Sequence, residues 1–276
     1  MILDLCSKPF AQVVAQLRDL VLEDPATHTY ALYDLVYESH RSRLIVNLEK
    51  DRVVGYVLRW CGRGACAVHV WGDVPLNIVD EALREAVERG AQEIKTVYIH
   101  IHSPGLEEPV KDIAREVLGG FSEHRFLDMV VDRASFRPSS RGVEAEIRVL
   151  DPERDAEAFA ELRREHGREL TLRECVETLR NCLYVGAFVG SELASMAGAI
   201  VRLRDAWIIA DVYTRPRYRG RGLGTAVTSR ITELAFIAGA KKAALHVHEQ
   251  NEVAKRIYEK LGYKVTAKKL WLVYQP

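Results

Sequence analysis

The segment from Val212 to Thr225 has the residue types of an anion-binding loop. It joins a strand-like apolar run to a helix-like run, and in between it carries the residues Arg215, Arg217, Arg219, Gly220, Arg221, Gly222 and Gly224. The first amide hydrogens of a helix have no partner inside the helix, and the helix dipole places partial positive charge at the same end. Glycines let phosphate oxygens approach these amides, and arginines add positive potential. The segment therefore predicts a pyrophosphate site.

Two common phosphate loops do not fit this segment. The run Arg219-Gly220-Arg221-Gly222-Leu223-Gly224 does not have the GxGxxG spacing that opens a dinucleotide-binding fold. It also lacks the Gly-Lys-Ser or Gly-Lys-Thr ending of a Walker loop. A nucleotide-binding protein of either type is therefore not indicated.

A second block of residues follows the loop. It reads Leu245-x-Val247-x-x-x-Asn251-x-x-Ala254-x-x-x-Tyr258-x-x-x-Gly262-Tyr263. With Arg219-x-x-Gly222-x-Gly224, this block resembles the GNAT superfamily of N-acetyltransferases in its pyrophosphate loop, closing strand and closing helix. The approach Val212-Tyr213-Thr214-x-Pro216-x-Tyr218 is similar to the FR-type branch of that superfamily. The resemblance covers about the last half of the chain.

The resemblance implies acetyl-CoA as co-substrate. The cofactor-binding residues that it implies are Val212, Tyr213, Thr214, Arg219, Gly220, Arg221, Gly222, Leu223, Gly224, Thr225 and Asn251. Backbone groups of Val212 and Thr214 would run beside the pantetheine arm, where the strands splay apart, and the Val212 amide would polarise the thioester carbonyl. Tyr258 would be the general acid that protonates the departing thiolate. Alternatively, Tyr258 is a core aromatic residue and Asn251 a helix N-cap.

The general base is left open. Attack on a thioester needs a neutral amine, so a carboxylate or a histidine is expected near the acceptor, and Asp211, His248 and Glu249 lie at strand ends. Asp211 precedes Val212, and strand alternation places neighbouring side chains on opposite faces unless the strand bulges. His246 and His248 share a strand face, but further metal ligands are not identifiable, so no metal site is expected.

The sequence thus favours an N-acyltransferase that transfers an acetyl group from acetyl-CoA to a primary amine by direct attack in a ternary complex. The alternatives are a non-catalytic acyl-CoA-binding regulatory protein and an acyltransferase for longer acyl chains. A small-molecule or peptide amine is the expected partner. The acceptor's identity and the oligomeric state are left open. Balanced charges, 39 basic and 39 acidic residues, give no sign of a nucleic-acid surface.

The elements that must position these residues follow from periodicity. After a turn-rich linker at 133–142, we expect a strand at 143–150, helices to about 166 and at 171–181, and strands at 184–189, 194–203 and 206–214. A helix at 225–238, a strand at 242–248, a helix at 252–261 and a strand at 263–274 complete this half.

The N-terminal half repeats the same order of helices and strands. Tyr98-Ile99-His100-Ile101-His102 even parallels Ala244-Leu245-His246-Val247-His248. We therefore expect an α/β (α+β) fold of two tandem GNAT-like domains, each a mixed, largely antiparallel sheet flanked by helices. Residues 1–132 would be a degenerate copy and residues 143–276 the catalytic domain. The segment Val70 to Leu76 runs almost directly into a helix without Arg-x-x-Gly-x-Gly, so the first copy is expected to bind no acetyl-CoA.

The termini and cysteines suggest no special compartment. No signal-peptide pattern and no membrane-spanning apolar run is found, so a cytoplasmic location without membrane association is expected. The five cysteines, Cys6, Cys61, Cys66, Cys175 and Cys182, lack zinc-type spacing. We therefore expect neither a disulfide framework nor a metal site, and interpret the cysteines as small core or surface residues.

Overall fold

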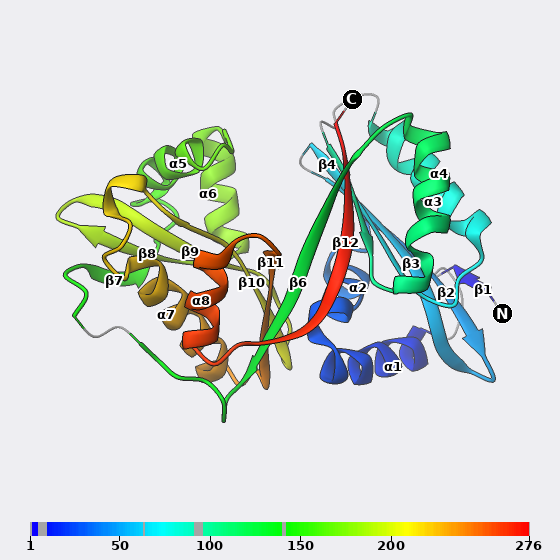
Figure 1. The fold of residues 1–276 in the computed structure, drawn as a ribbon, viewed down its shortest axis with the longest axis horizontal. Coiled ribbons are helices and arrows are strands. Elements are labelled where there is room, and N and C mark those ends of the chain that lie inside the picture. Colours follow the sequence, from blue (N-terminus) through cyan, green and yellow to red (C-terminus); the bar gives the residue numbers. More distant parts are fainter. Residues whose placement is uncertain (1, 5–9, 63, 91–95, 140–141, 276) are drawn as a thin grey trace. The chain divides into compact units, whose positions relative to one another are not determined.

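The chain forms two compact units in the computed structural model, which describes residues 2–4, 10–62, 64–90, 96–139 and 142–275 (Figure 1). Unit 1 comprises Met1–Asp128, His248–Gln250 and Ala267–Pro276, and unit 2 comprises Met129–Val247 and Asn251–Thr266. The units therefore do not follow a single cut at residues 133–142, because the last strand contributes to unit 1. Among the described residues, every helix is too short or too polar to span a lipid bilayer.

Unit 1 has a sheet with helices on both faces. Its elements are β1 (Ile2–Asp4), α1 (Phe10–Glu23), α2 (Pro25–Tyr37), β2 (Ser42–Glu49), β3 (Arg52–Gly62), β4 (Ala65–Gly72), α3 (Leu76–Gly90), β5 (Thr96–Ile101), the short 3-10 turn η1 (Pro104–Leu106), α4 (Glu107–Leu118) and β6 (Ser122–Asp132). The strand order is β1-β2-β3-β4-β5-β12-β6, where β12 is Lys264–Tyr274. Only β4 and β5 are paired in parallel among the registered pairs of this unit.

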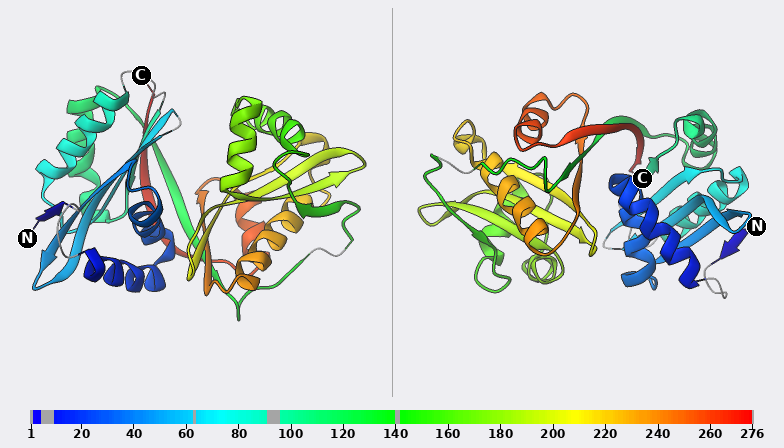
Figure 2. Two further views of the ribbon diagram at one scale, coloured as in Figure 1. Left: turned by 180° about the vertical axis from the view of Figure 1, so that it is seen from behind. Right: turned by 90° about the horizontal axis from the view of Figure 1, so that it is seen from below.

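Strand alternation divides the unit 1 sheet into two different faces. Val68 and Val70 on β4 and Ile99 on β5 are buried under α3 and α4, in a core that also takes Leu270 and Leu272 from β12. Helices α1 and α2 cover the opposite face (Figures 1 and 2). Burying these two leucines explains why the end of the chain belongs to unit 1, whereas we expected it to close the C-terminal domain.

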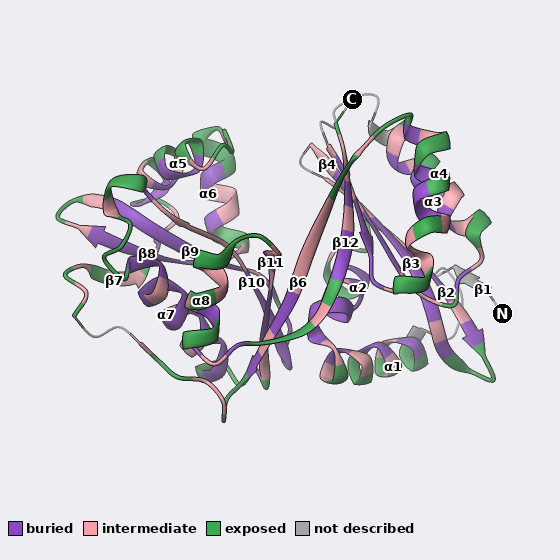
Figure 3. Cartoon of the chain, viewed as in Figure 1, coloured by how far each residue is buried: buried purple, intermediate pink, exposed green. Residues whose placement is uncertain are grey.

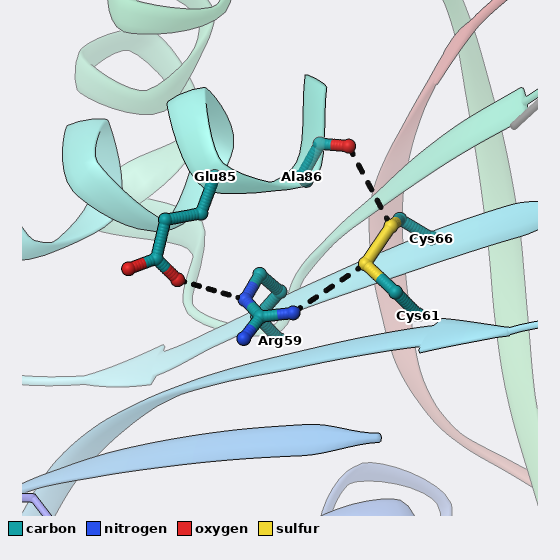
Figure 4. Close-up of a disulfide and its surroundings, with 5 residues drawn as sticks. All are labelled: Arg59, Cys61, Cys66, Glu85 and Ala86. Atoms are coloured by element: carbon teal, nitrogen blue, oxygen red, sulfur yellow. Dashed lines mark hydrogen bonds and ion pairs between the residues drawn. A yellow bond between two sulfur atoms is a disulfide. The ribbon is translucent and has the colours of Figure 1, made fainter. Parts of the chain in front are cut away.

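Cys61 and Cys66 form a disulfide across the β3–β4 hairpin (Figure 4). Nη1 of Arg59 lies 3.5 Å from the Cys61 sulfur, while its Nε donates to Glu85 at 2.9 Å. The Cys66 sulfur lies 3.6 Å from the Ala86 carbonyl oxygen, a contact without a hydrogen bond because a disulfide sulfur carries no hydrogen. The expectation of no disulfide is wrong for this pair, since the antiparallel register places the two residues opposite each other. Spacing alone does not reveal that register.

Unit 2 repeats the layout of unit 1. Its elements are β7 (Glu146–Val149), α5 (Ala156–Glu165), α6 (Leu172–Asn181), β8 (Leu183–Val189), β9 (Glu192–Arg202), β10 (Ala206–Thr214), the short 3-10 turn η2 (Pro216–Tyr218), α7 (Leu223–Ile237), β11 (Lys242–His248) and α8 (Glu252–Lys260). The strand order is β6-β11-β10-β9-β8-β7, with β10 and β11 parallel and the pairs from β7 to β10 antiparallel. The expected fold class, mixed and largely antiparallel sheets flanked by helices, is confirmed.

Helices cover both faces of the unit 2 sheet. Phe159 and Leu162 of α5 and Leu179 of α6 pack with Tyr184 and Met196 on one face, and α7 lies against the other (Figures 1 and 2). Burial is continuous along β9 from Leu193 to Ala199, whereas β10 is buried from Ala206 to Ile209 and half-buried beyond (Figure 3). Of the other described cysteines, Cys175 is buried in this core and Cys182 is half-buried, both with free thiols as expected, while Cys6 lies outside the described residues.

The expected linker is packed against unit 2 over its described residues. The Arg137 amide donates to the Leu261 carbonyl at 3.0 Å, and the Ser139 amide donates to Oγ of Ser229 at 2.9 Å. The Phe136 ring contacts Phe236 of α7. Residues 140 and 141 lie outside the described part. The described segment therefore packs on α7 and on the end of α8 and is not a flexible linker.

The Asp155 carboxylate stabilises the start of α5. It accepts hydrogen bonds from Arg148 at 2.5 and 2.8 Å and from the Asp151 amide at 2.7 Å. Burial by itself raises the pKa of a carboxyl, but these hydrogen bonds outweigh it and lower the pKa of Asp155 to about 2 from 3.8. The carboxylate is therefore more favourable in the folded state than in the unfolded chain.

We predict that Asp155→Asn lowers the free energy of unfolding by about 2 kcal/mol at neutral pH, the equivalent of the pKa difference. Because the folded-state pKa is depressed, this stabilisation is complete above pH 4 and is lost as the pH falls through 2. Urea unfolding curves at pH 7 and pH 2 measure it. The wild-type and variant curves should differ at pH 7 and converge at pH 2, and a constant difference would contradict the assignment.

Candidate active site

The pairing between strands β10 and β11 ends about halfway along β10. Their parallel pairing runs from Ala206 opposite Lys242 to Ile209 opposite Leu245, although β10 continues to Thr214. The other edge of β10 stays paired with β9 as far as Thr214 opposite Ser195. One edge of β10 beyond Ile209 is thus unpaired with β11, as the expected splaying requires. An extended amide chain such as pantetheine can hydrogen-bond to such an edge.

A β-bulge reshapes β10 within this unpaired stretch. The register with β9 shifts between Ala210 and Tyr213, and Asp211 has a positive φ of 53°. The Ser195 hydroxyl donates to the Tyr213 carbonyl at 2.8 Å and lies 2.8 Å from the Thr214 hydroxyl, which secures the strand beyond the bulge. Asp211 was a candidate general base only if its strand carries a bulge, and this bulge is present.

The glycine loop ends in an open helix N-terminus. Gly220 and Gly222 both have φ of 77°, a left-handed conformation that favours glycine. Gly222 is the N-cap of α7, and no side chain caps the helix there. A Cβ at Gly224 would lie 3.3 Å from Oγ1 of Thr214 and 3.6 Å from Cδ1 of Ile257. The first amides of α7 therefore have no side-chain cap, and the loop packs closely against the end of β10 and against α8.

The four arginines of the loop do not act alike. Arg215 is buried and its guanidinium pairs with Glu165 and Glu192, while Arg217 also pairs with Glu192. The expectation that both add positive potential to the loop is wrong, because carboxylates neutralise them. Arg219 and Arg221 are exposed, and Nε of Arg219 donates to the Thr214 carbonyl at 3.2 Å. Only these last two arginines present charge beside the glycines.

Asn251 and Tyr258 lie at the two ends of α8. Asn251 caps the helix, since its side chain accepts from the Ala254 amide at 3.1 Å, so the N-cap interpretation is right and leaves room for a second role. Tyr258 is 6% exposed, and burial raises the pKa of its hydroxyl to about 12. Its neighbour Ile257 lies next to Gly224, so α8 borders the loop. In the described part of the chain, the Tyr258 hydroxyl has no hydrogen-bond partner.

A polar cluster lies on the face of β10 that packs against α5. Oδ2 of Asp211 accepts a hydrogen bond from the Tyr184 hydroxyl at 2.6 Å and lies 2.7 Å from Nη1 of Arg163. Burial raises the pKa of Asp211, but Arg163 and the more distant Arg168 outweigh burial and lower it. Asp211 is therefore an ionised structural anion and a weak base.

His166 also belongs to this cluster. It was not identified from the sequence as a candidate base. Its ring stacks on Tyr213, with 4.6 Å between centroids, and among the described residues its Nδ1 is buried without a hydrogen-bond partner. Burial lowers the pKa of His166, with Asp211 opposing and Arg163 assisting. His166 follows α5 directly, and nothing in that local sequence relates it to the bulge 45 positions further on (211 − 166).

The other candidate bases belong to unit 1. The His248 ring makes edge contacts with His124 and Phe126, and Glu249 pairs with Lys268 at 2.5 Å. Both therefore have established structural contacts in their own unit. Of the three bases expected from the sequence, only Asp211 lies on the bulged strand of unit 2.

Residues 148–263 match the family model described as the acetyltransferase (GNAT) family. This part of the chain is a GNAT acetyltransferase domain, which confirms the resemblance seen in the sequence. A mouse thialysine N-epsilon-acetyltransferase is 32% identical over 68 residues, or 24% of this chain. The match spans 40% of that relative's length, so the chain matches less than half of it.

Two solved structures resemble the whole chain. The GCN5-related N-acetyltransferase from Sphaerobacter thermophilus has a TM-score of 0.66 at 14% identity, covering 99% of this chain and 95% of that one. A tandem GNAT protein from the clavulanic acid biosynthesis pathway has a TM-score of 0.60 at 13% identity, covering 100% and 98%. At these identities the likeness concerns the fold, and it agrees with two GNAT-like copies in one chain.

Proposed function

We propose that unit 2 transfers an acetyl group from acetyl-CoA to a primary amine by direct attack in a ternary complex. The observation that carries the proposal is the open edge of β10, which leads straight to the uncapped N-terminus of α7. An amide-rich arm that ends in a pyrophosphate matches these two features in order. Acetyl-CoA has that chemistry, and the family of residues 148–263 supports it.

Each cofactor-binding residue has a separate task in this proposal. The backbone of Val212, Tyr213 and Thr214 binds the pantetheine amides, and the amides of residues 219–225 bind the pyrophosphate. The exposed Arg219 and Arg221 add charge. Asn251 contacts the cofactor from the start of α8.

The chemical step needs one acid and one base. The amine nitrogen attacks the thioester carbon, the Val212 amide stabilises the developing oxyanion, and the C–S bond then breaks. The thiolate takes a proton from Tyr258, and the proton lost by the amine passes to the base. His166 is the base in this proposal, because it is neutral at neutral pH and its ring stacks on Tyr213, one residue from Val212.

We predict that His166→Gln and His166→Phe both lower turnover by about 100-fold, the usual size of a general-base contribution, with acetyl-CoA affinity unchanged. Phenylalanine keeps the ring contact with Tyr213 but takes no proton. Because the pKa of His166 is lowered, wild-type turnover should hold at neutral pH and decrease only as the pH falls below the usual histidine range. Full activity of the phenylalanine variant would show that the ring only packs.

We further propose that unit 1 binds no acetyl-CoA. Its corresponding strands β4 and β5 stay paired from Ala65 opposite Thr96 to Val70 opposite Ile101, and the His102 amide then donates to the Val70 carbonyl at 2.9 Å. Over these described pairs, β4 and β5 leave no open edge for pantetheine. We predict that calorimetric titration of the full chain gives one equivalent of acetyl-CoA, and two equivalents would contradict the proposal.

The acceptor is best found with an array of amines, read out by mass spectrometry for the acetylated product and by thiol release. Amino acids of the lysine and thialysine type belong in the array because of the mouse relative's name. Peptides and polyamines test the wider class. Binding of acetyl-CoA without turnover on any amine would favour a non-catalytic acyl-CoA-binding protein. A preference for acyl-CoA substrates with longer acyl chains would favour the alternative of a longer-chain acyltransferase.

A further inference from the structure

Three buried histidines converge on one face of the unit 1 sheet. His69 on β4 and His100 on β5 are direct partners in the parallel register, and His102 lies directly after the end of β5, where its amide donates to the Val70 carbonyl. Their exposed fractions are 3%, 7% and 2%. Histidine is rarely buried in groups, because each ring nitrogen needs a partner away from water. The cluster lies outside the acetyltransferase domain.

The ring nitrogens of the three residues are close enough to share one ion. One nitrogen from each lies within 4.8 Å of the other two. Nδ1 of His69 and Nε2 of His102 are 3.1 Å apart, with ring planes 9° from parallel. Zinc bound tetrahedrally by imidazoles at about 2.0–2.1 Å needs nitrogens about 3.3 Å apart. One of the three nitrogen–nitrogen distances is therefore already close to this value, and ion binding requires side-chain rotations that shorten the other two.

Two aromatic side chains lie against the cluster. The Trp271 ring lies 4.0 Å from His100, and the Tyr30 ring of α2 lies 5.1 Å from His69. Imidazole nitrogens are ligands for zinc, copper and nickel, not for calcium or magnesium. The nearby Lys269 ammonium, bonded to the His102 carbonyl at 2.7 Å, opposes a cation and weakens its affinity.

We propose that His69, His100 and His102 bind one transition-metal ion, with Zn²⁺ as the reference ion. Without the ion, His69 and His102 share a hydrogen bond. With the ion bound, that hydrogen moves to the far nitrogen of its ring, so all three rings ligate as neutral imidazoles and no net proton is lost. The ion would link β4 to β5. The corresponding strands of unit 2, β10 and β11, are no longer paired at this point. The role of the ion is to stabilise unit 1.

The test uses the full chain with any affinity tag removed and residual metal stripped by a chelator. Addition of Zn²⁺ should give one bound equivalent by elemental analysis after gel filtration and should raise the melting temperature. Co²⁺ should give the visible absorption bands of a low-coordinate nitrogen-ligated site. Wild-type protein that retains no metal, or that shows neither effect, overturns the proposal whatever the variants do.

Variants locate the ion. His69→Gln and His102→Gln should lose the bound equivalent and the thermal shift, while His40→Gln, at an exposed turn position, should keep both. Retention by both cluster variants overturns the proposal. If a cluster variant does not fold, nitrogen NMR of the histidine rings in the wild-type protein shows which histidines bind the ion. Zn²⁺-dependent shifts must fall on His69, His100 and His102, and shifts confined to other histidines overturn the assignment.

Discussion

Replacing Gly222 and Gly224 together by valine is expected to abolish acetyl-CoA binding, a decrease in affinity of at least ~100-fold, or about 2.7 kcal/mol. Gly222 has φ of 77°, so a side chain there strains the backbone by about 1–2 kcal/mol and turns the first amides of α7 away. At Gly224 the Cβ alone would lie 3.3 Å from Thr214 and 3.6 Å from Ile257, so the extra methyl groups must displace the loop.

Isothermal titration calorimetry with acetyl-CoA measures this effect. Gly190→Ala is the matched control, because Gly190 also has a positive φ, of 61°, with open space around it, but lies in the β8–β9 turn. That variant carries similar backbone strain and should keep its affinity for acetyl-CoA. Unchanged affinity in the Gly222/Gly224 double variant would remove the central claim that this loop binds the pyrophosphate.

Tyr258→Phe is expected to lower turnover by about 100-fold or more while leaving acetyl-CoA affinity nearly intact. The ring stays in place, so the packing around α8, including the contact with the Tyr263 ring, is preserved, and only the proton donor is lost. Burial raises the pKa of Tyr258 to about 12, so the hydroxyl stays protonated from pH 6 to 10. The decrease should therefore be the same size at every pH in that interval.

Single-turnover and steady-state rates for both proteins across this pH interval provide the measurement. Tyr263→Phe is the control, because Tyr263 is another buried tyrosine 6.0 Å from Tyr258, and its hydroxyl bonds to Thr232 at 2.7 Å. Losing that bond should cost about 1 kcal/mol of stability without changing turnover. Equal turnover of wild type and Tyr258→Phe would mean that solvent protonates the thiolate and that Tyr258 is structural.

Local patterns in the sequence determined the acetyltransferase domain and the order of its elements. The glycines from Gly220 to Gly224, the N-cap Asn251 and the periodicity of the helices act over a few residues, so they can be read without the fold. The repeat of the same order in the first half predicted two GNAT-like copies for the same reason.

Only the tertiary structure decided features that depend on residues distant in the chain. The Cys61–Cys66 disulfide follows from hairpin register, and the neutralisation of Arg215 follows from Glu165, 50 positions earlier. His166 meets the bulged strand only when α5 packs on the sheet, and β12 leaves its expected domain because Leu270 and Leu272 are buried in unit 1. Pairing and burial set these contacts, and both are properties of the folded chain that no short window of sequence contains.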